Sequence, residues 1–174
     1  MGVKNFERLV IDASIARSAG ESAHPTSSNC RIFLETVMQQ GYLLVMTREI
    51  KQEWDKHQSR FARTWLSSMV AKKQLLAISN SGDYANMWDI LDRFYQDKQR
   101  KEVIKDIHLL EAAFESDRCI FSLDDKMRSL LQQAIECCPE IAGIIWANPD
   151  RDDEKIIIWL QSGMPDSKSR CLHI

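Results

Sequence analysis

The sequence lacks several features that would define its class at once. It has no run of about 18 apolar residues, so no membrane-spanning helix is expected. Its five cysteines form no CxxC pair and no spacing with histidine, and no histidine-rich cluster suited to zinc is present. The odd cysteine count and the lack of a signal peptide predict reduced thiols in a cytoplasmic protein.

The chain also lacks a charge excess of either sign. Its 174 residues carry 23 Lys and Arg against 25 Asp and Glu, which gives a net charge of -2. This balance argues against a basic nucleic-acid coat. It leaves room for a nucleic-acid enzyme, because such an enzyme needs only a local basic rim beside its site. There is no repeat or low-complexity segment, and a hydrophobic fraction of 44% predicts a single globular domain over residues 1–174.

Short apolar runs rich in branched residues alternate with longer amphipathic stretches. This alternation predicts a three-layer α/β/α fold with a central, mostly parallel sheet. One long helix is expected after Thr47, with Trp54 and Trp65 on its buried face. Residues 57–105 are too long for one crossover and are interpreted as a helical insertion, and residues 147–174 as a C-terminal extension. The expected strands are 9–11, 43–46, 119–121 and 141–146, while 75–78 is either a short strand or a turn.

Four carboxylates are expected at one edge of this sheet. Asp12 ends the first strand, and Asp124 follows the strand at 119–121. Asp106 is expected to open a helix, and Glu53 lies about one and a half turns into the helix after the second strand. Because the carboxyl ends of parallel strands and the starts of the following helices share an edge, these side chains should converge.

Each acid also has a plain structural explanation. An Asp at a strand-to-helix junction is usually a helix cap, and Asp124 and Asp125 compete for one role. A convergent set is different, because crowded carboxylates repel one another unless a cation neutralises them. Mg²⁺ or Mn²⁺ is the natural cation for a site built only from oxygen. The convergence therefore predicts a metal site.

These segments resemble the conserved blocks of PIN-domain nucleases, in the same order, between residues 8 and 131. The matching segments are 9–14 (LVIDAS), 47–54 (TREIKQEW), 105–113 (KDIHLLEAA) and 120–124 (IFSLD). The resemblance implies an endonuclease that needs Mg²⁺ or Mn²⁺ and acts on RNA. Its metal ligands would be Asp12, Glu53, Asp106 and Asp124, with Asp125 as a rival for the last position. Ser14 and Ser122 would orient ligands or water through their hydroxyl groups.

A phosphate backbone requires cations near the acidic edge. The best placed are Arg17, Arg100, Lys101 and Lys105, although the run before Asp106 is equally well explained as a solvated helix face. His57, one turn beyond Glu53, is left out because a histidine there is more often structural. The expected partner is RNA, with single-stranded DNA, a homodimer and an inhibitor protein left open. The alternative hypothesis is a catalytically inactive PIN-like module that binds RNA or a protein partner.

Overall fold

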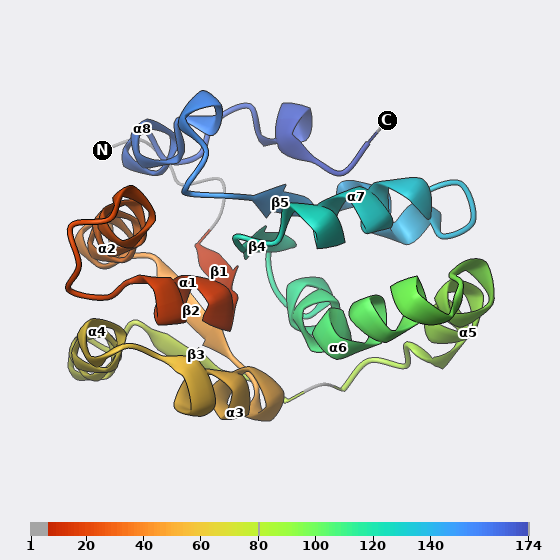
Figure 1. Cartoon of the computed structure of the whole chain (residues 1–174), viewed down its shortest axis with the longest axis horizontal. Helices are drawn as coiled ribbons and strands as arrows, with labels where there is room; N and C mark the ends of the chain where they lie inside the picture. Colours follow the sequence, from red (N-terminus) through yellow and green to blue (C-terminus); the bar gives the residue numbers. More distant parts are fainter. Residues whose placement is uncertain (1–6, 80, 174) are drawn as a thin grey trace.

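A computed structural model describes residues 7–79 and 81–173. It has a five-stranded sheet, which Figure 1 shows between two layers of helices. The strand order is β3-β2-β1-β4-β5, and every pairing is parallel. The predicted three-layer α/β/α architecture is therefore confirmed. The strands are β1 (Arg8–Ile11), β2 (Leu43–Met46), β3 (Leu75–Ala77), β4 (Cys119–Phe121) and β5 (Ile145–Ala147).

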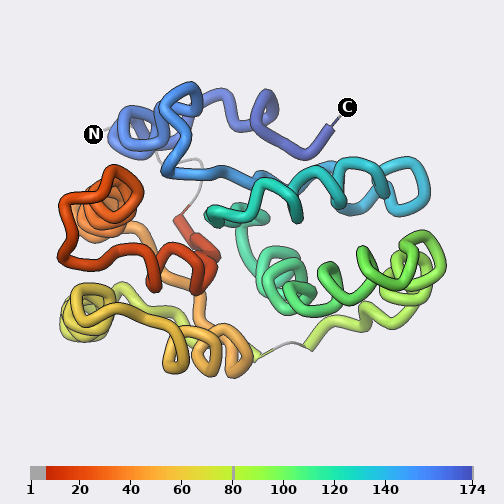
Figure 2. The backbone as a smooth tube through the Cα atoms, viewed as in Figure 1, coloured from red at the N-terminus to blue at the C-terminus, as the bar shows by residue number. Residues whose placement is uncertain are grey.

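The helices divide between the two faces of the sheet. Figures 1 and 2 show α2, α4 and α8 on one side and α5, α6 and α7 on the other, while α1 and α3 lie at the carboxyl ends of the strands. The helices are α1 (Ala13–Ser18), α2 (Pro25–Gln39), α3 (Arg48–His57), α4 (Arg60–Ala71), α5 (Ala85–Phe94), α6 (Asp97–Phe114), α7 (Asp125–Gln133) and α8 (Ile156–Gln161). Three short 3₁₀ helices, Pro139–Gly143, Asp152–Glu154 and Ser167–Arg170, complete the C-terminal part.

A sheet covered on both faces requires strands that are apolar along their whole length. Leu9, Val10 and Ile11 of β1 are fully buried, and the buried residues of the protein form one hydrophobic core. Within the described ranges, no helix is long and apolar enough to cross a membrane.

The predicted burial of the two tryptophans is confirmed. Trp54 and Trp65 are 0% and 3% exposed, and their rings stack with centroids 6.0 Å apart. Each indole N–H reaches a backbone carbonyl of another element: Trp54 Nε1 donates to Ile11 O at 2.9 Å and Trp65 Nε1 to Leu34 O at 2.6 Å. These bonds satisfy the polar end of a buried ring. They also fix α3 and α4 against β1 and α2.

The single long helix expected after Thr47 is two helices. Thr47 caps α3 as predicted, its hydroxyl accepting a hydrogen bond from Ile50 N at 3.2 Å. Ser59 then ends the run, because its hydroxyl accepts from Ala62 N at 3.0 Å and so caps a new helix, α4. The Ser59 N–H donates to Ala16 O at 3.0 Å, which ties the break to α1. A local cap has overridden a continuous apolar stripe.

The segment 57–105 is more than a helical insertion. Residues 75–77 form the edge strand β3, which pairs in parallel with β2. Helix α6 begins at Asp97, so the expectation that Asp106 opens a helix is wrong. The basic run before Asp106 is already helical, because its residues favour helix and Asp97 lies in the positive first turn. Asp106 reaches the sheet edge because α6 packs against β1 and β4.

Residues 147–174 are likewise integrated with the domain over the part that is described. Helix α8 packs on α2, and Tyr42 Oη donates a 2.7 Å hydrogen bond to Leu160 O. Cys171 then forms an antiparallel bridge with Ile145 along the outer side of β5. The C-terminal segment therefore completes one helical layer and covers a sheet edge.

The strand order reverses between β1 and β4. From β1 the chain builds outward to β2 and β3, then returns to place β4 on the other side of β1. Asp117 fixes this junction, because its carboxylate accepts bonds from the backbone N of Glu7 and Arg8, both at 2.8 Å, and from Arg8 Nη2 at 2.6 Å. In open parallel sheets, a crevice forms at such a reversal, outside the carboxyl ends of the strands.

A candidate active site at the carboxyl ends of β1 and β4

A pocket of about 470 Å³ lies at this reversal. Its lining comes from α1, α3, α6 and the loop between β4 and α7, so segments distant in sequence meet there. All five carboxylates proposed from the sequence are among the lining residues: Asp12, Glu53, Asp106, Asp124 and Asp125.

Asp12 is held by two serine hydroxyls. Its Oδ2 accepts hydrogen bonds from Ser14 Oγ at 2.6 Å and from Ser122 Oγ at 2.7 Å. The Asp12 N–H donates to Phe121 O at 2.9 Å, which continues the pairing of β1 with β4 past the strand ends. The two serines therefore fix one carboxylate oxygen of Asp12.

The same two hydroxyls hold the loop after β4. Ser122 Oγ accepts from Asp124 N at 3.1 Å, and Ser14 Oγ accepts from Leu123 N at 3.2 Å. Ser122 is fully buried, so its hydroxyl links the Asp12 carboxylate to the Asp124 backbone without competition from solvent. This pair of contacts fixes the start of α7 relative to β1.

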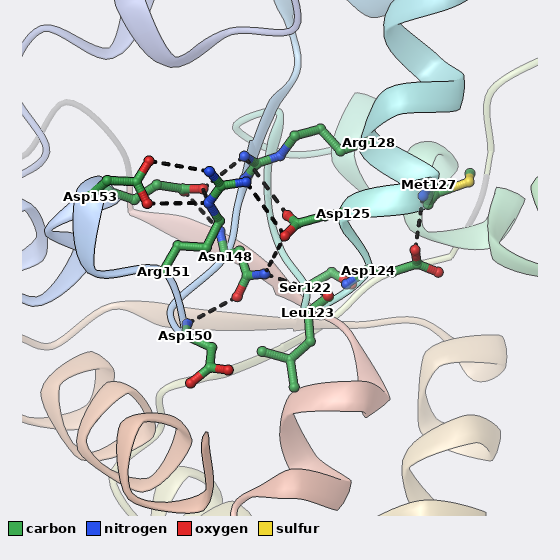
Figure 3. A network of polar contacts seen from close by, with 11 residues as sticks. Ser122, Leu123, Asp124, Asp125, Met127, Arg128, Asn148, Asp150, Arg151 and Asp153 are labelled. Atoms are coloured by element: carbon green, nitrogen blue, oxygen red, sulfur yellow. Dashed lines mark hydrogen bonds and ion pairs between the residues drawn. The ribbon is translucent and has the colours of Figure 1, made fainter. Parts of the chain in front are cut away.

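The structure distinguishes Asp124 from Asp125. Asp124 is the N-cap of α7, its Oδ1 accepting from Met127 N at 2.8 Å. Figure 3 shows Asp125 turned away from Asp124 toward two arginines. Its Oδ2 accepts from Asn148 Nδ2 at 3.2 Å and lies 3.6 Å from Arg151 Nη1, and its Oδ1 lies 3.9 Å from Arg128 Nη1. A carboxylate neutralised by arginines is a poor cation ligand, so we assign the site acid to Asp124.

Asp106 is the carboxylate most affected by its neighbours. Burial, and after it the negative charge of Asp12, raises the pKa of Asp106 to about 6, with smaller contributions from Asp124 and Glu53. Lys105 opposes this rise. Two separate causes therefore act on one group: it is partly removed from water, and it faces other acids.

Glu53 lies on α3 with partners from its own helix. Its Oε1 accepts a 2.9 Å hydrogen bond from Lys56 Nζ, and its Oε2 lies 3.5 Å from His57 Nε2. The Lys56 hydrogen bond is the main reason that the pKa of Glu53 is lowered, and it outweighs the opposing effect of burial. Glu53 is thus ionised across the neutral range and is held toward its own helix.

Two of the four proposed phosphate-binding cations line the pocket. Arg17 lies in the last turn of α1, and Lys105 precedes Asp106 on α6. Lys101 is exposed on α6, outside the lining residues. Arg100 lies elsewhere, with its Nε 3.3 Å from Asp92 Oδ1 and its Nη2 donating to Tyr95 O at 3.2 Å. The prediction for Arg100 is therefore withdrawn, because its guanidinium packs between α5 and α6.

Three further pocket residues were missed or set aside. His57 lines the pocket although the sequence argument left it out, and so do His108 and Lys126. Burial lowers the pKa of His108, against the opposite effect of Asp12 and Glu53. His108 could have been found from the sequence, since it lies three residues after Lys105 on one helical face. Lys126 pairs with Glu102 at 2.6 Å, a contact between α7 and α6 that only the fold reveals.

The chemistry of the pocket suits a hard divalent cation. Its acids supply only oxygen donors, and a cation would relieve the repulsion that, after burial, raises the pKa of Asp106. However, among residues 7–79 and 81–173 no group of three or more His, Cys, Asp or Glu side chains is assembled that could hold a metal ion. Glu53 is engaged with Lys56, and Asp124 is engaged as a cap. The donor set fits a divalent cation in kind, and binding one would require these side chains to rearrange.

Comparisons with protein-family models, with curated proteins and with solved structures gave no match.

Proposed function

We propose that this protein is a metal-dependent endonuclease of the PIN type that hydrolyses phosphodiester bonds in RNA. The observation that carries the proposal is the shared pocket of Asp12, Glu53, Asp106 and Asp124 at the reversal of strand order. The fold does not require four acids from four segments to meet at one crevice. Asp124 also serves as the N-cap of α7, but for Asp106 the position in the pocket only raises the pKa of its carboxyl group.

Different residues of the pocket would position the metal ligands, bind the phosphate backbone and hold the metal ion. Ser14 and Ser122 fix Asp12 by one oxygen, which leaves its other oxygen to face the pocket. Lys105 and Arg17 supply positive charge at the rim, where a phosphate backbone would bind. A Mg²⁺ or Mn²⁺ ion held by Asp12, Asp106, Asp124 and Glu53 would polarise the phosphoryl group and lower the pKa of an attacking water.

The preference for RNA rests on the resemblance of the sequence to PIN-domain nucleases, and single-stranded DNA stays an alternative substrate. A homodimer and an inhibitor protein stay predictions on the same basis. All five cysteines are free thiols, which agrees with the cytoplasmic location proposed from the sequence.

A second candidate function is an inactive module that binds RNA or a protein. It is favoured by one observation: no three-ligand group is preassembled within the described ranges. It is opposed by the cost of keeping Asp106 beside other carboxylates, which a scaffold has no reason to maintain.

Cleavage of a labelled single-stranded RNA by purified protein tests the proposal. We expect cleavage with Mn²⁺, none with EDTA, and at least about tenfold slower cleavage by Asp124→Asn. This substitution tests the charge alone, because Asn retains an oxygen that can accept the hydrogen bond from Met127 N and removes only the negative charge. Asp97→Asn, the same change at an exposed position on α6, is the control.

The same assay with a DNA strand of equal sequence decides between the two substrates. If neither strand is cut, and Mn²⁺ does not raise the melting temperature, the metal-site proposal is lost and the binding module becomes the better account.

A further prediction concerns Ser122, which we place as a positioning residue. Ser122→Ala removes the hydroxyl that joins Asp12 Oδ2 to Asp124 N. We expect the Mn²⁺ concentration for half-maximal activity to rise about 10- to 100-fold. Ser162→Ala, which removes a hydroxyl bonded within α8, is the control. An unchanged Mn²⁺ requirement in Ser122→Ala would show that this link does not position the ligands.

A further inference from the structure

A second pocket, of about 300 Å³, lies between α7, β5 and the C-terminal segment. We refer to it as the arginine pocket, because Arg128, Arg151 and Arg170 all line it. It adjoins the pocket of the candidate active site through Asp125, which lines that first pocket and lies 3.6 Å from Arg151 Nη1 (Figure 3).

Three hydrogen-bond donors at this pocket have no acceptor. They are Nε and Nη2 of Arg128 and Nε1 of Trp146, each shielded from solvent and without a partner among the described residues. Trp146 is 3% exposed, and the side chain of Arg128 is 18% exposed. A buried donor without an acceptor is costly, so three beside one pocket point to an absent acceptor.

The Nε–Nη2 edge of Arg128, although shielded from solvent, has a specific geometry. Nη1 is used by Glu154 Oε1 at 2.7 Å, which holds the guanidinium in place. The Nε–Nη2 edge that remains presents two parallel N–H groups, the arrangement that binds two oxygens of one anion. Trp146 Nε1 adds a third donor from a different element, β5.

The carboxylates nearby do not bond to this edge. Asp125 Oδ1 is itself shielded without a hydrogen-bond partner among the described residues, and its contact with Arg128 is to Nη1, at 3.9 Å. Both oxygens of Glu154 are already engaged, Oε1 with Arg128 and Oε2 with Asn148 N at 2.9 Å. Asp153 faces Arg151, with its Oδ1 3.2 Å from Arg151 Nε and its Oδ2 3.3 Å from Arg151 Nη2 (Figure 3). Arg170 donates to Glu154 O at 2.8 Å and stacks on Trp159, and its charge has no carboxylate partner among the residues that the structure describes.

We propose that the arginine pocket binds a phosphoryl group through the Nε–Nη2 edge of Arg128 and the indole N–H of Trp146. Three donors on two side chains match an anion with at least three oxygens better than a carboxylate, which has two. The volume is about ten times the roughly 30 Å³ of a liquid water molecule, so a tetrahedral oxyanion fits in the pocket, and the shielded donors would turn toward it on binding. The site goes beyond the proposed nuclease and does not depend on it, because no metal takes part.

Titration with inorganic phosphate in EDTA tests this site. We expect saturable binding by calorimetry and a rise in melting temperature, neither of which chloride at matched ionic strength reproduces. Trp146→Phe, which removes only the N–H, and Arg128→Met should each weaken phosphate binding at least about tenfold. Arg93→Met, an exposed arginine on α5, should bind phosphate as the wild type does.

Because Arg128→Met also removes the partner of Glu154, Trp146→Phe keeps the test independent of any folding defect. Absence of phosphate binding by the wild type, or equal binding by folded Trp146→Phe, would overturn the proposal.

Competition experiments with a 5′-phosphorylated and an unphosphorylated oligonucleotide then identify which molecule carries the bound phosphoryl group. Competition by the phosphorylated strand alone assigns the site to a nucleic-acid terminus, and competition by neither assigns it to free phosphate. Since EDTA abolishes the metal-dependent cleavage, phosphate binding can succeed or fail separately from it.

Discussion

Asp106→Asn should reduce Mn²⁺-dependent RNA cleavage by about 10²- to 10³-fold. The substitution keeps the size of the side chain and removes the one carboxylate whose ionisation is opposed by both burial and neighbouring acids. We expect a larger loss than for Asp124→Asn, because Asp124 is partly occupied as the cap of α7. Single-turnover cleavage rates at saturating Mn²⁺ provide the measurement.

The same variant should be more stable than the wild type without metal. The pKa of Asp106 is raised from 3.8 to about 6, so the folded state holds this proton more tightly than the unfolded state. The contribution of Asp106 to stability is therefore fully present below about pH 4, declines as the pH rises from 4 to 6, and is lost above about pH 7. Once solvent screening is allowed for, this rise in pKa corresponds to a loss of about 1–2 kcal/mol in the free energy of unfolding of the wild type at high pH.

In a thermal melt at pH 8 in EDTA, Asp106→Asn should melt about 2–8 °C above the wild type, and at pH 4.5 the difference should fall to about a third of that. Added Mn²⁺ should stabilise the wild type and not the variant. Asp97→Asn should show neither effect. Equal melting temperatures of wild type and Asp106→Asn at pH 8 would mean that burial and the neighbouring acids do not oppose the ionisation of Asp106.

Trp54→Ala should lower the free energy of unfolding by about 3–5 kcal/mol. Trp54 is fully buried, stacks on Trp65, and donates its indole N–H to Ile11 O at the end of β1. The truncation leaves a cavity and an unsatisfied carbonyl one residue before Asp12. Urea denaturation followed by circular dichroism measures the change.

Trp54→Phe separates the two contributions to this loss. It keeps most of the buried ring but removes the donor, so about 1–3 kcal/mol should be lost. The control is Ile158→Ala on α8, where a side chain in a residue 66% exposed should cost less than about 0.5 kcal/mol. A loss below about 1.5 kcal/mol in Trp54→Ala would show that α3 is not anchored to β1 through this ring.

The parts of the fold that could be predicted from sequence are those governed by local patterns. The strand at Leu43–Met46 has the predicted bounds, because a short apolar run covered on both faces is unambiguous once turn residues bound it. The third strand was ambiguous, since its burial is only partial and an edge position relaxes the pattern. The break at Ser59 was missed because the apolar stripe continues across it, and only the contact of Ser59 with Ala16 reveals the cap.

In the candidate site, too, the residues that could be predicted are those placed by local patterns. Asp12 and Asp124 follow directly from strand ends, and parallel pairing brings them together. Asp106 was selected for an incorrect reason: it lies well inside α6, and long-range packing of that helix against β1 and β4 brings it to the edge. Arg100 does not line the pocket, whereas Asp125, which the sequence left as a rival of Asp124, lines it while facing Arg128 and Arg151. The contacts of Arg100 with Asp92 and of Asp125 with Arg151 depend on how the elements pack, and only Arg128, three residues after Asp125 on the same helix, is indicated by sequence spacing.

The placement of β4 beside β1 also determines when the acidic crevice can exist during protein synthesis. Its central contact, between Asp12 and Ser122, joins residues 110 positions apart. At about 5–20 residues per second, a ribosome needs roughly 5–20 s to add that length of chain. Once β2 has been made, β1 has β2 on one side and, until β4 follows, an unpaired edge on the other. A nascent chain stalled before β4 therefore carries no assembled crevice, and it presents an edge that invites chaperones or aggregation.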